Sequence, residues 1–453
     1  MNIIVGNAWP YANGKLHLGR IAVLLPGDIL ARYHRMMGDN VLFISGSDAH
    51  GRPVTVKALE ENKTPGEILE KYHKEFVECF NKINFSFDLF TSTDTDYHKK
   101  EVMKFIKELY DKGYIYEGDD KELFFSLSKF ENDVKKIFIK QQSWRENAQS
   151  ITKKYVDEGL RDKSVTKEID WGVDVPLEGF EDKKIFVWIE ALMGYITATS
   201  KCLENTNETV EDYWNDEESK VYLVHGKDNI PFHTTIFPGL LSALGFKNVN
   251  LSIISSEHLK LEGKDFSTNK NWAIWVDDIC KRYYVDTIRY YLILNGPENK
   301  DTDFKWRNFI NANNYDLVGE LDALYRNTIL NLKREEIKKT DKDRLLNMYF
   351  ELSDKIESGR FKEALKDIFK LIREENKKNK ASIITLINVA NMLEPFIPKT
   401  SMRIKKEFGI DKSIWSFIDE YKLPRNIHYK PLFKFIDRKK LNDEIKFLKD
   451  KKV

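Results

Sequence analysis

The sequence predicts an α/β fold, a doubly wound parallel sheet, followed by an all-α helical bundle domain. Two observations predict the sheet: a strand, a turn, a helix and a second strand open the chain, and apolar β-rich runs recur later. A third observation predicts the helical domain, because the pattern beyond a boundary near residue 310 is helical almost throughout and contains little glycine.

The first elements form a predicted βαβ unit. Residues 3–9 are an apolar strand that ends in the turn Pro-Tyr-Ala-Asn-Gly. A helical pattern covers 20–35, and a second strand at 41–45 is closed by the turn-forming residues 46–51. A crossover helix between two neighbouring strands indicates parallel pairing.

Later elements follow from the same periodicities. Amphipathic helices are predicted within residues 65–112 and 128–165. Further strands are predicted at three β-rich runs, each followed by turn residues: Lys184–Trp188, Val221–Val224 and Val249–Ile254. From Thr287 onward we expect helices.

Composition narrows the class of protein. Of 453 residues, 42% are hydrophobic and 32% charged, which allows a sizeable core in a soluble chain. The sequence has no apolar run of about 18 residues, so a membrane-spanning helix is excluded. Residues 1–6 resemble a strand rather than a signal peptide. The three cysteines are far apart, which excludes a disulfide framework and a CxxC zinc site and favours a reducing cytoplasm.

The net charge of +1 hides a division along the chain. Residues 1–330 carry 42 Lys and Arg against 52 Asp and Glu, whereas residues 331–453 carry 31 against 20. A basic C-terminal part on an acidic body is typical of a protein that binds nucleic acid with that part. A lysine-rich, solvated helical surface explains the same numbers.

The turn after the first strand is a candidate phosphate site. A glycine-containing turn before a helix leaves backbone N–H groups free to bind anions. His17 can donate to a phosphate oxygen, Gly19 permits close approach, and Arg20 adds a fixed positive charge. By itself, a His-x-Gly-x tetrapeptide such as residues 17–20 is common by chance. Its position after the first strand favours a functional role.

Two further segments are candidates for nucleotide binding. Gly226-Lys-Asp-Asn229 follows a predicted strand, where polar groups face the ligand crevice of an open α/β sheet and Asp228 can accept from ribose hydroxyls. In the loop 261–270, Lys264 and Lys270 can neutralise a polyphosphate. By themselves, the two segments are equally compatible with an ordinary surface turn and an ordinary charged loop.

In their order and spacing, these segments resemble the class I aminoacyl-tRNA synthetases, most closely the methionyl-tRNA synthetase family. The likeness runs from residue 3 to about 330, and weakly on to 435. Four segments resemble the family's HIGH signature, second sheet-edge motif, methionine-pocket motif and GKDNxxFH stretch: Ala8–Gly19, Ser47–Gly51, Phe186–Tyr195 and Gly226–His233. Four others resemble the KMSKS loop, the two stem-contact segments and the last helix: Lys264–Lys270, Asp286–Tyr291, Glu298–Phe304 and Pro431–Phe433.

The resemblance implies a domain organisation. It predicts a Rossmann-like catalytic domain in two halves, a connective insertion, a KMSKS-like loop with the stem-contact segment, and a helical anticodon-binding-like domain. The corresponding residues are 1–110 with 185–255, 111–184, 256–309 and 310–453. The resemblance implies a tRNA partner, and without a further C-terminal module we expect a monomer.

The resemblance also implies activation of methionine by ATP with Mg²⁺. Attack of the amino acid carboxylate on the α-phosphorus then needs positioning and charge stabilisation, without a covalent enzyme intermediate. The implied catalytic residues are His17, Arg20, Lys264 and Lys270. The implied ATP-binding residues are Asn13, Gly14, His17, Gly19, Arg20, Gly226, Lys227 and Asp228.

A methionine pocket is implied by a second group of residues. Asp48 would hold the substrate ammonium through a charge-assisted hydrogen bond, and aromatic walls suit a thioether. The implied amino-acid-binding residues are Trp9, Tyr11, Asp48, Trp188, Ala191, Tyr195, Asn229 and His233. The alternative for the aromatic residues is plain core packing.

The chain departs from the family in its insertion and in its KMSKS-like loop. Five residues, 117–121, stand where the family usually carries Cys-rich zinc knuckles, so we expect no structural zinc and no metal ligands. Arg20 replaces the usual His or Asn of the signature. Asp265 and Thr268 replace the two lysines of KMSKS, and an aspartate there would repel pyrophosphate and slow the activation step. The flanking Lys264 and Lys270 are the residues that could compensate for this loss.

A further departure concerns tRNA recognition. Family members read the anticodon with an Asn and an Arg four residues apart and a later Trp. Here Arg326 is kept, Asp322 replaces the Asn, and the Pro-Trp segment is missing after 374–380. A stacked base is worth roughly 1–3 kcal/mol, so we expect weaker recognition of the usual tRNA.

Three functions are therefore compatible with the sequence. The first is a methionyl-tRNA synthetase type of ligase, and the second is a synthetase-like paralogue that activates methionine or a related amino acid for an altered tRNA or a non-tRNA acceptor. The third is a non-catalytic RNA-binding protein, which would bind no nucleotide and would bind RNA with a strong salt dependence.

Overall fold

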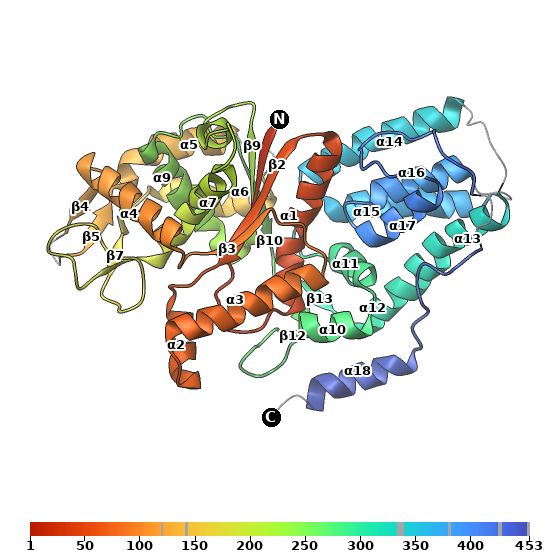
Figure 1. Ribbon diagram of the computed structural model, residues 1–453, viewed down its shortest axis with the longest axis horizontal. Helices are drawn as coiled ribbons and strands as arrows, with labels where there is room; N and C mark the ends of the chain where they lie inside the picture. Colours follow the sequence, from red (N-terminus) through yellow and green to blue (C-terminus); the bar gives the residue numbers. More distant parts are fainter. Residues whose placement is uncertain (119–120, 141–143, 333–338, 379–381, 425–427, 451–453) are drawn as a thin grey trace. The chain divides into compact units, whose positions relative to one another are not determined.

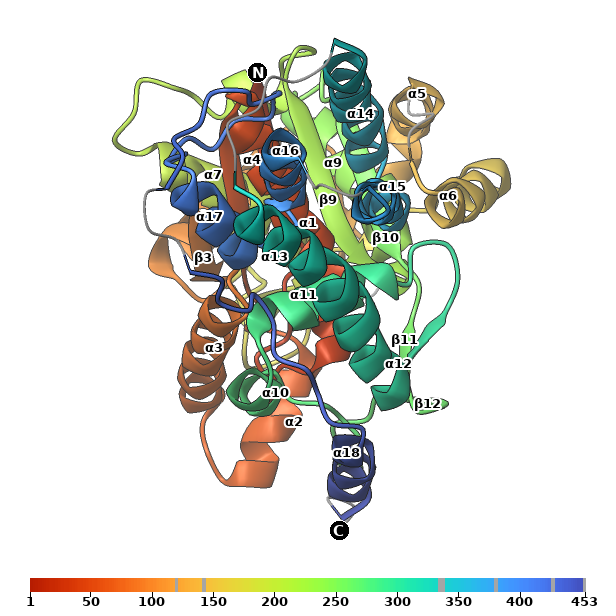
Figure 2. The same ribbon diagram turned by 90° about the vertical axis from the view of Figure 1, so that its right-hand side faces the viewer.

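The computed structural model describes residues 1–118, 121–140, 144–332, 339–378, 382–424 and 428–450. The chain forms two compact units (Figures 1 and 2). Unit 1 comprises Met1–Lys15, Asn40–Asn81 and Ser86–Ser256. Unit 2 comprises Leu16–Asp39, Lys82–Phe85 and Glu257–Val453.

A five-stranded, fully parallel sheet is the centre of unit 1 (Figure 1). Its strands are β1 (Asn2–Asn7), β2 (Asn40–Ser47), β3 (Leu89–Ser92), β9 (Lys220–Gly226) and β10 (Leu251–Ser256). β1, β9 and β10 are almost completely buried, as strands covered on both faces must be. The predicted parallel α/β fold is confirmed.

The strand order is β10-β9-β1-β2-β3. The chain therefore starts in the middle of the sheet, builds outward to β3 and returns to the other side of β1. This places a topological switch point between β1 and β9, and ligands of open α/β sheets bind outside the carboxyl ends of the strands at such a point. The two strands remain paired to their ends, where the Ala8 N–H donates to the Val224 carbonyl at 2.9 Å.

Helices and a small insertion complete unit 1. The helices are α2 (Arg52–Glu61), α3 (Pro65–Lys82), α4 (Asp96–Asp111), α5 (Glu131–Lys140), α6 (Glu146–Glu158), α7 (Val187–Leu203), α8 (Glu211–Trp214) and α9 (Phe237–Leu244). Short strands are β4 (Ile115–Glu117), β5 (Leu123–Phe125), β6 (Lys163–Ser164), β7 (Thr166–Lys167) and β8 (Lys184–Ile185). Apolar residues of α4, α7 and α9 share one core with one face of the sheet.

Two predicted elements of unit 1 differ from the structure. β3 interrupts the predicted helical stretch 65–112. The sequence pattern does not reveal this strand, because four residues are too few to disturb the helical period around them. The predicted strand Lys184–Trp188 keeps only β8, since α7 begins at Val187. α7 is buried on most of its surface, and periodicity alone does not separate such a helix from a buried strand.

Unit 2 contains α1 (Leu18–Met37), a three-stranded sheet and the C-terminal helices. The sheet pairs β11 (Leu259–Leu261) with β12 (Lys264–Asp265) and β13 (Thr302–Phe304), so the expected helical region from Thr287 onward is interrupted by β13. The helices are α10 (Val276–Arg282), α11 (Val285–Leu294), α12 (Trp306–Asn311), α13 (Asp322–Leu330), α14 (Lys339–Glu357), α15 (Phe361–Asn376), α16 (Ile383–Leu393), α17 (Pro398–Glu407) and α18 (Lys439–Asp450). A π-helix, Ala312–Leu321, joins α12 to α13. Both views show α15, α16 and α17 side by side (Figures 1 and 2).

Arg289 of α11 ties α1 to the C-terminal helices. Its guanidinium donates to Asp28 of α1 at 2.6 Å and to the carbonyls of Phe396 at 2.9 Å and Pro395 at 3.1 Å. Arg289 and Asp28 are both 0% exposed. These bonds pair most of the N–H donors of the guanidinium, whose charge would otherwise be costly to bury. They also explain why α1 belongs to unit 2.

One expected boundary, between residues 255 and 256, lies next to a division between the units, after Ser256. The boundary expected near residue 310 falls in α12, inside unit 2. Of the link 117–121, residues 119–120 lie outside the described part, as do residues 379–380 of the segment 374–380. No helix of the described chain is long and apolar enough to cross a membrane.

Candidate active site

Trp9 lies just beyond the carboxyl end of β1. Its indole fits against two glycines: a Cβ built on Gly46 would lie 2.1 Å from Trp9 Cζ3, and one on Gly194 would lie 2.9 Å from Cζ2. Trp9 also meets Tyr195 edge-on, with ring centroids 6.3 Å apart. Tyr195 in turn covers Gly6, where a Cβ would stand 2.8 Å from the ring. The glycines therefore determine where the aromatic walls stand.

Tyr195 and His233 are linked by a buried hydrogen bond. His233 Nδ1 donates to the Asn229 carbonyl at 2.9 Å, so Nε2 is left to accept the Tyr195 hydroxyl proton, also at 2.9 Å. Burial lowers the pKa of His233 to about 4, which keeps the ring neutral and this arrangement intact at neutral pH. His225 stacks on His233 with centroids 4.2 Å apart.

Asp48 presents a buried carboxylate to the same region. The backbone N–H of His50 donates to it, but Oδ1 has no partner among the described residues. Burial and the negative charge of Glu190 raise the pKa of Asp48 well above its usual range. A buried carboxylate oxygen without a donor is expensive, and a cationic ligand would remove that cost.

Tyr11 and Trp188 are placed next to Asp48. Tyr11 pairs with Asp48 in an isolated parallel bridge, and its ring fills the space in front of Gly51, where a Cβ would be 2.2 Å away. The Trp188 side chain hydrogen-bonds Tyr11 and is 47% exposed. Ala191 lies one turn of α7 further on and is half-buried. Trp188 is therefore not packed in the core, whereas Tyr195 belongs to the hydrophobic core and Trp9 packs against that core.

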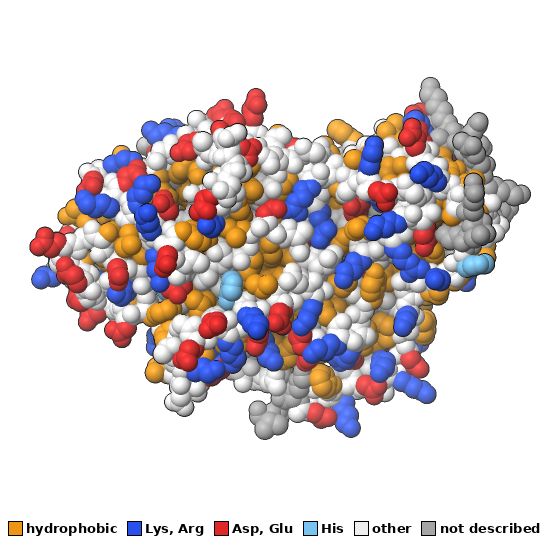
Figure 3. Space-filling view, in the orientation of Figure 1, with side chains coloured by type: hydrophobic (Ala, Val, Ile, Leu, Met, Phe, Trp, Pro, Cys, Tyr) orange, Lys and Arg blue, Asp and Glu red, His pale blue; other side chains and the backbone are white. Residues whose placement is uncertain are grey.

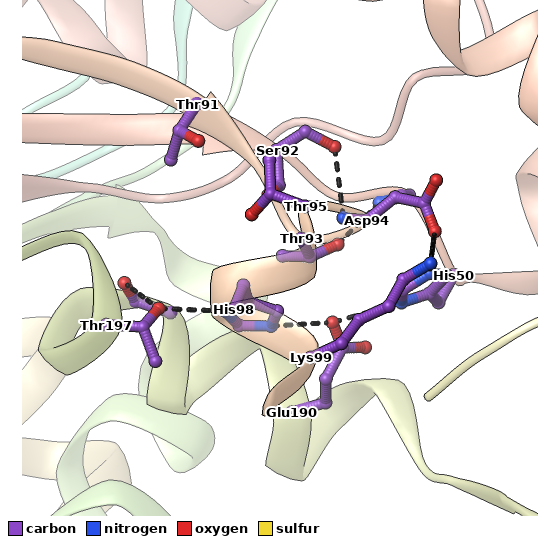
Figure 4. Close-up of polar contacts among 12 residues, drawn as sticks. His50, Thr91, Ser92, Thr93, Asp94, Thr95, His98, Lys99, Glu190 and Thr197 are labelled. Carbon is purple, nitrogen blue, oxygen red and sulfur yellow. Dashed lines mark hydrogen bonds and ion pairs between the residues drawn. The ribbon is translucent and has the colours of Figure 1, made fainter. Parts of the chain in front are cut away.

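A buried ionic network behind Asp48 was not among the predicted site residues (Figure 4). Glu190 Oε1 accepts from His50 Nδ1 at 3.1 Å and from His98 Nε2 at 3.0 Å. The remaining ring nitrogens bond Asp94 Oδ1 at 3.0 Å and Thr197 Oγ1 at 2.8 Å. The available signals were the position of His50 directly after Ser47-Asp-Ala and that of Glu190 inside Phe186–Tyr195.

The segment after β9 lies at the switch point. Lys227–Asn229 form one short 3-10 turn, so Gly226 and Lys227 directly follow the strand. Asp228 is exposed and Gly226 and Lys227 are half-buried. Polar groups at this position face the crevice in which open α/β sheets bind ligands, as the sequence predicts.

His17 lies in unit 2, immediately before α1. Its ring stacks on Phe266 with centroids 4.8 Å apart, and it meets Trp275 edge-on at 6.2 Å. Burial and the charge of Arg20 lower the pKa of His17 to about 3, so the ring is neutral. Gly19 lies beneath this stack, where a Cβ would stand 3.0 Å from His17 and 3.1 Å from Phe266.

The KMSKS-like loop is ordered around Phe266. Lys264 and Asp265 form the exposed strand β12, and Ser267 pairs with Trp272 across the loop. The Lys264 ammonium lies over the Trp272 ring, 5.0 Å from its centroid. Lys270 is exposed. The structure therefore brings Phe266 to the predicted catalytic His17 and leaves both predicted lysines accessible.

Asp322 has an internal role in the helical region. It is 4% exposed and accepts from the Tyr429 hydroxyl at 2.5 Å and the Leu432 N–H at 2.7 Å. It therefore anchors the segment that leads to α18 and does not present a free carboxylate to a base. Arg326, one turn later on α13, is exposed.

The predicted site residues divide between the units. All eight predicted amino-acid-binding residues belong to unit 1, as do Asn13, Gly14 and Gly226–Asp228. His17, Gly19, Arg20 and the KMSKS-like loop belong to unit 2. No group of three or more His, Cys, Asp or Glu in the described residues could hold a metal ion. Charged side chains of both signs are interspersed over the face in Figure 3.

Comparisons with known proteins agree on one family. Residues 3–123 and 118–329 match the family model described as tRNA synthetases class I (M). Methionine--tRNA ligase 1 of Alkaliphilus oremlandii is 37% identical, over 98% of this chain and 99% of that protein. A methionine--tRNA ligase of Bacillus cereus is 36% identical over 98% of each.

A solved structure confirms the fold. Mycobacterium tuberculosis methionyl-tRNA synthetase bound to methionyl-adenylate superposes with a TM-score of 0.82, covering 96% of this chain and all of that one. The two sequences are 18% identical, so the likeness is one of fold.

Proposed function

The chain belongs to the methionyl-tRNA synthetase family of class I tRNA synthetases, and on this premise we propose that it activates methionine with ATP and transfers it to tRNA. In the first step the methionine carboxylate attacks the α-phosphorus of ATP and pyrophosphate leaves. In the second a terminal ribose hydroxyl of the tRNA attacks the adenylate carbonyl and AMP leaves. Neither step needs a covalent bond to the enzyme.

The observation that carries this proposal is the unpaired Oδ1 of Asp48 beside an aromatic pocket. The α-ammonium of an amino acid supplies the missing donors and the missing positive charge. Trp9, Tyr195 and His233 then line the side-chain pocket, where aromatic rings favour a thioether sulfur by about 0.3–1.5 kcal/mol per contact. Trp188 and Tyr11 close the margin, with Ala191 and Asn229 completing the wall.

For ATP, the proposed contacts follow the predicted residues. Asn13, Gly14 and Gly19 leave space for the phosphates, and a neutral His17 can donate to a phosphate oxygen. Arg20, Lys264 and Lys270 would stabilise the negative charge that develops on pyrophosphate, whose oxygens also bind Mg²⁺. Gly226 and Lys227 would border the adenosine, and Asp228 is proposed to accept from its ribose hydroxyls.

For tRNA, we propose contacts from the basic C-terminal part, including the exposed Arg326. Because Asp322 is used internally, it contributes nothing to base recognition. This favours a second candidate, a family member that serves an altered tRNA or another acceptor. A charging assay on initiator and elongator methionine tRNAs separates the two, and efficient charging of both would exclude the second candidate.

ATP–pyrophosphate exchange with each of the twenty amino acids tests the first step. We expect exchange with methionine and not with leucine, isoleucine or valine. Exchange with a different amino acid would contradict the pocket assignment, and no exchange with any of them would contradict the proposed activity.

A further inference from the structure

The buried network behind Asp48 consists of charged side chains that pair with one another. Glu190 is 0% exposed, and the two histidines hold its carboxylate ionised, with its pKa lowered to about 2. Glu190 and Asp94 together raise the pKa of His50 to about 9, so that ring is a cation at neutral pH. Lys99 forms an ion pair with Asp94 at 2.5 Å.

Within this group each inner charge has a partner except one. His50 cancels Glu190, and Lys99 cancels Asp94 at the half-buried end of the network. His98 is hydrogen-bonded on both ring nitrogens, through Nε2 to Glu190 at 3.0 Å and through Nδ1 to Thr197 Oγ1 at 2.8 Å. Among these carboxylates, the one with an unpaired oxygen and no ion pair is that of Asp48.

We propose that Glu190 is a positioning residue for the substrate ammonium, because its carboxylate neutralises His50 and so leaves Asp48 free to bind a cation. Without the Glu190 charge, the imidazolium of His50 would act as a counter-ion of Asp48, whose pKa it lowers. The ammonium would then meet a neutral site. This inference rests on the proposed function and adds a determinant of amine selection to it.

The geometry supports the proposal in two further ways. The backbone N–H of His50 donates to Asp48, so the residue that Glu190 fixes through its side chain also fixes Asp48 through its main chain. Glu190 Oε2 is buried without a partner among the described residues, as is Asp48 Oδ1. The charges of both carboxylates raise the pKa of the same tyrosine, Tyr11.

Binding of three probes to the full chain without ATP tests the proposal. The probes are L-methionine, L-methioninol, which keeps the ammonium and lacks the carboxylate, and desamino-methionine, which lacks the ammonium. In Glu190→Gln we expect the Kd of the two amines to rise about 10- to 100-fold, as expected for losing one charge at short range, with little change for desamino-methionine. Glu190→Asp should restore most of the affinity.

A second variant separates charge balance from mere structural damage. Glu190→Gln/His50→Gln removes both members of the ion pair and returns the single excess negative charge to Asp48, so amine binding should recover relative to Glu190→Gln. Glu122→Gln, a partly buried carboxylate bonded to Thr166 and Lys183, is the matched control and should leave all three Kd values unchanged.

Several outcomes would overturn the proposal. These are equal loss for all three probes, no loss for any, a double variant as weak as the single one, or a wild-type chain that binds no amine. If Glu190→Gln alone fails to fold, the double variant and Glu190→Asp still decide, because both should keep amine selection. Wild-type amine binding without ATP–pyrophosphate exchange would count against the proposed function and leave this proposal standing.

Discussion

The indole of Trp9 occupies the space in which any side chain at position 46 would stand. A Cβ on Gly46 would lie 2.1 Å from Cζ3 and 2.5 Å from Cε3 of that ring, and 2.7 Å from the Thr91 carbonyl oxygen. Gly46 lies in β2, whereas Trp9 follows β1. The pocket wall therefore depends on a missing side chain in the neighbouring strand.

Gly46→Ala should displace Trp9 and raise the KM for methionine about 10- to 100-fold, because small displacements at a binding wall have effects of that size. Overpacking should also lower the free energy of unfolding by about 1–3 kcal/mol. Steady-state exchange kinetics and urea unfolding measure both. Gly66→Ala, where the nearest atom is 3.8 Å from the new Cβ, is the control, and an equal effect there would refute the argument.

Asp48→Asn should weaken methionine binding and raise the free energy of unfolding. Losing the charge at the ammonium site should raise the KM for methionine at least about 30-fold. The pKa of Asp48 is higher in the folded chain than in the unfolded chain. Ionisation of Asp48 therefore destabilises the folded chain at any pH above the unfolded pKa, and the loss grows as the pH rises toward the folded pKa. The variant should therefore be about 1–3 kcal/mol more stable at neutral pH. Thermal unfolding without ligand measures this, and a less stable variant would contradict it.

His50 should make stability fall at alkaline pH. Its folded pKa is raised from 6.5 to about 9, so its contribution is fully present below pH 6.5 and is lost as pH rises through 9. The contribution of His50 to the free energy of unfolding is on the order of 3 kcal/mol. Urea unfolding of the wild type and His50→Gln between pH 6 and 10 should show the difference between them shrinking over that window. A constant difference would mean that His50 is not charged.

Arg289→Met should destabilise unit 2 by about 3–5 kcal/mol, because it removes the guanidinium from a site where several carbonyls and Asp28 depend on it. Denaturant unfolding measures the loss. Lys153→Ala removes a partner of the exposed Lys153–Asp157 pair and should cost less than about 0.5 kcal/mol. Comparable losses at the two positions would show that burial of Arg289 carries no energetic weight.

Asp265→Lys should improve ATP use, since it replaces a negative charge in the KMSKS-like loop with the lysine that the family carries. The side chain is exposed and screened by salt, so we expect a modest three- to tenfold fall in the KM for ATP at about 0.1 M salt. Pyrophosphate exchange at varied ATP concentration measures it. Asp157→Lys makes the same change in net charge elsewhere, and it should have no effect.

Much of the fold follows from local patterns that the sequence displays directly. β1 and β9 are apolar runs followed by turns, and the period of residues 20–35 is helical, so alternating strands and helices predict a parallel sheet. The carboxyl end of a parallel strand faces the ligand crevice, which is why the sequence predicts a binding role for Gly226–Asp228. The roles proposed for Asp48 and His17 rest on the family resemblance.

Only the tertiary structure decided which of these residues meet. Glu190 and His50 are 140 positions apart, and their ionic contact, which explains the charge left on Asp48, has no periodicity that a sequence could reveal. Asp322 looks like an altered anticodon residue, yet Tyr429 and Leu432 occupy its oxygens. Local sequence determines backbone conformation through short-range sterics. Protonation states, ion pairs and unpaired hydrogen-bonding atoms depend instead on neighbours that folding brings from far along the chain.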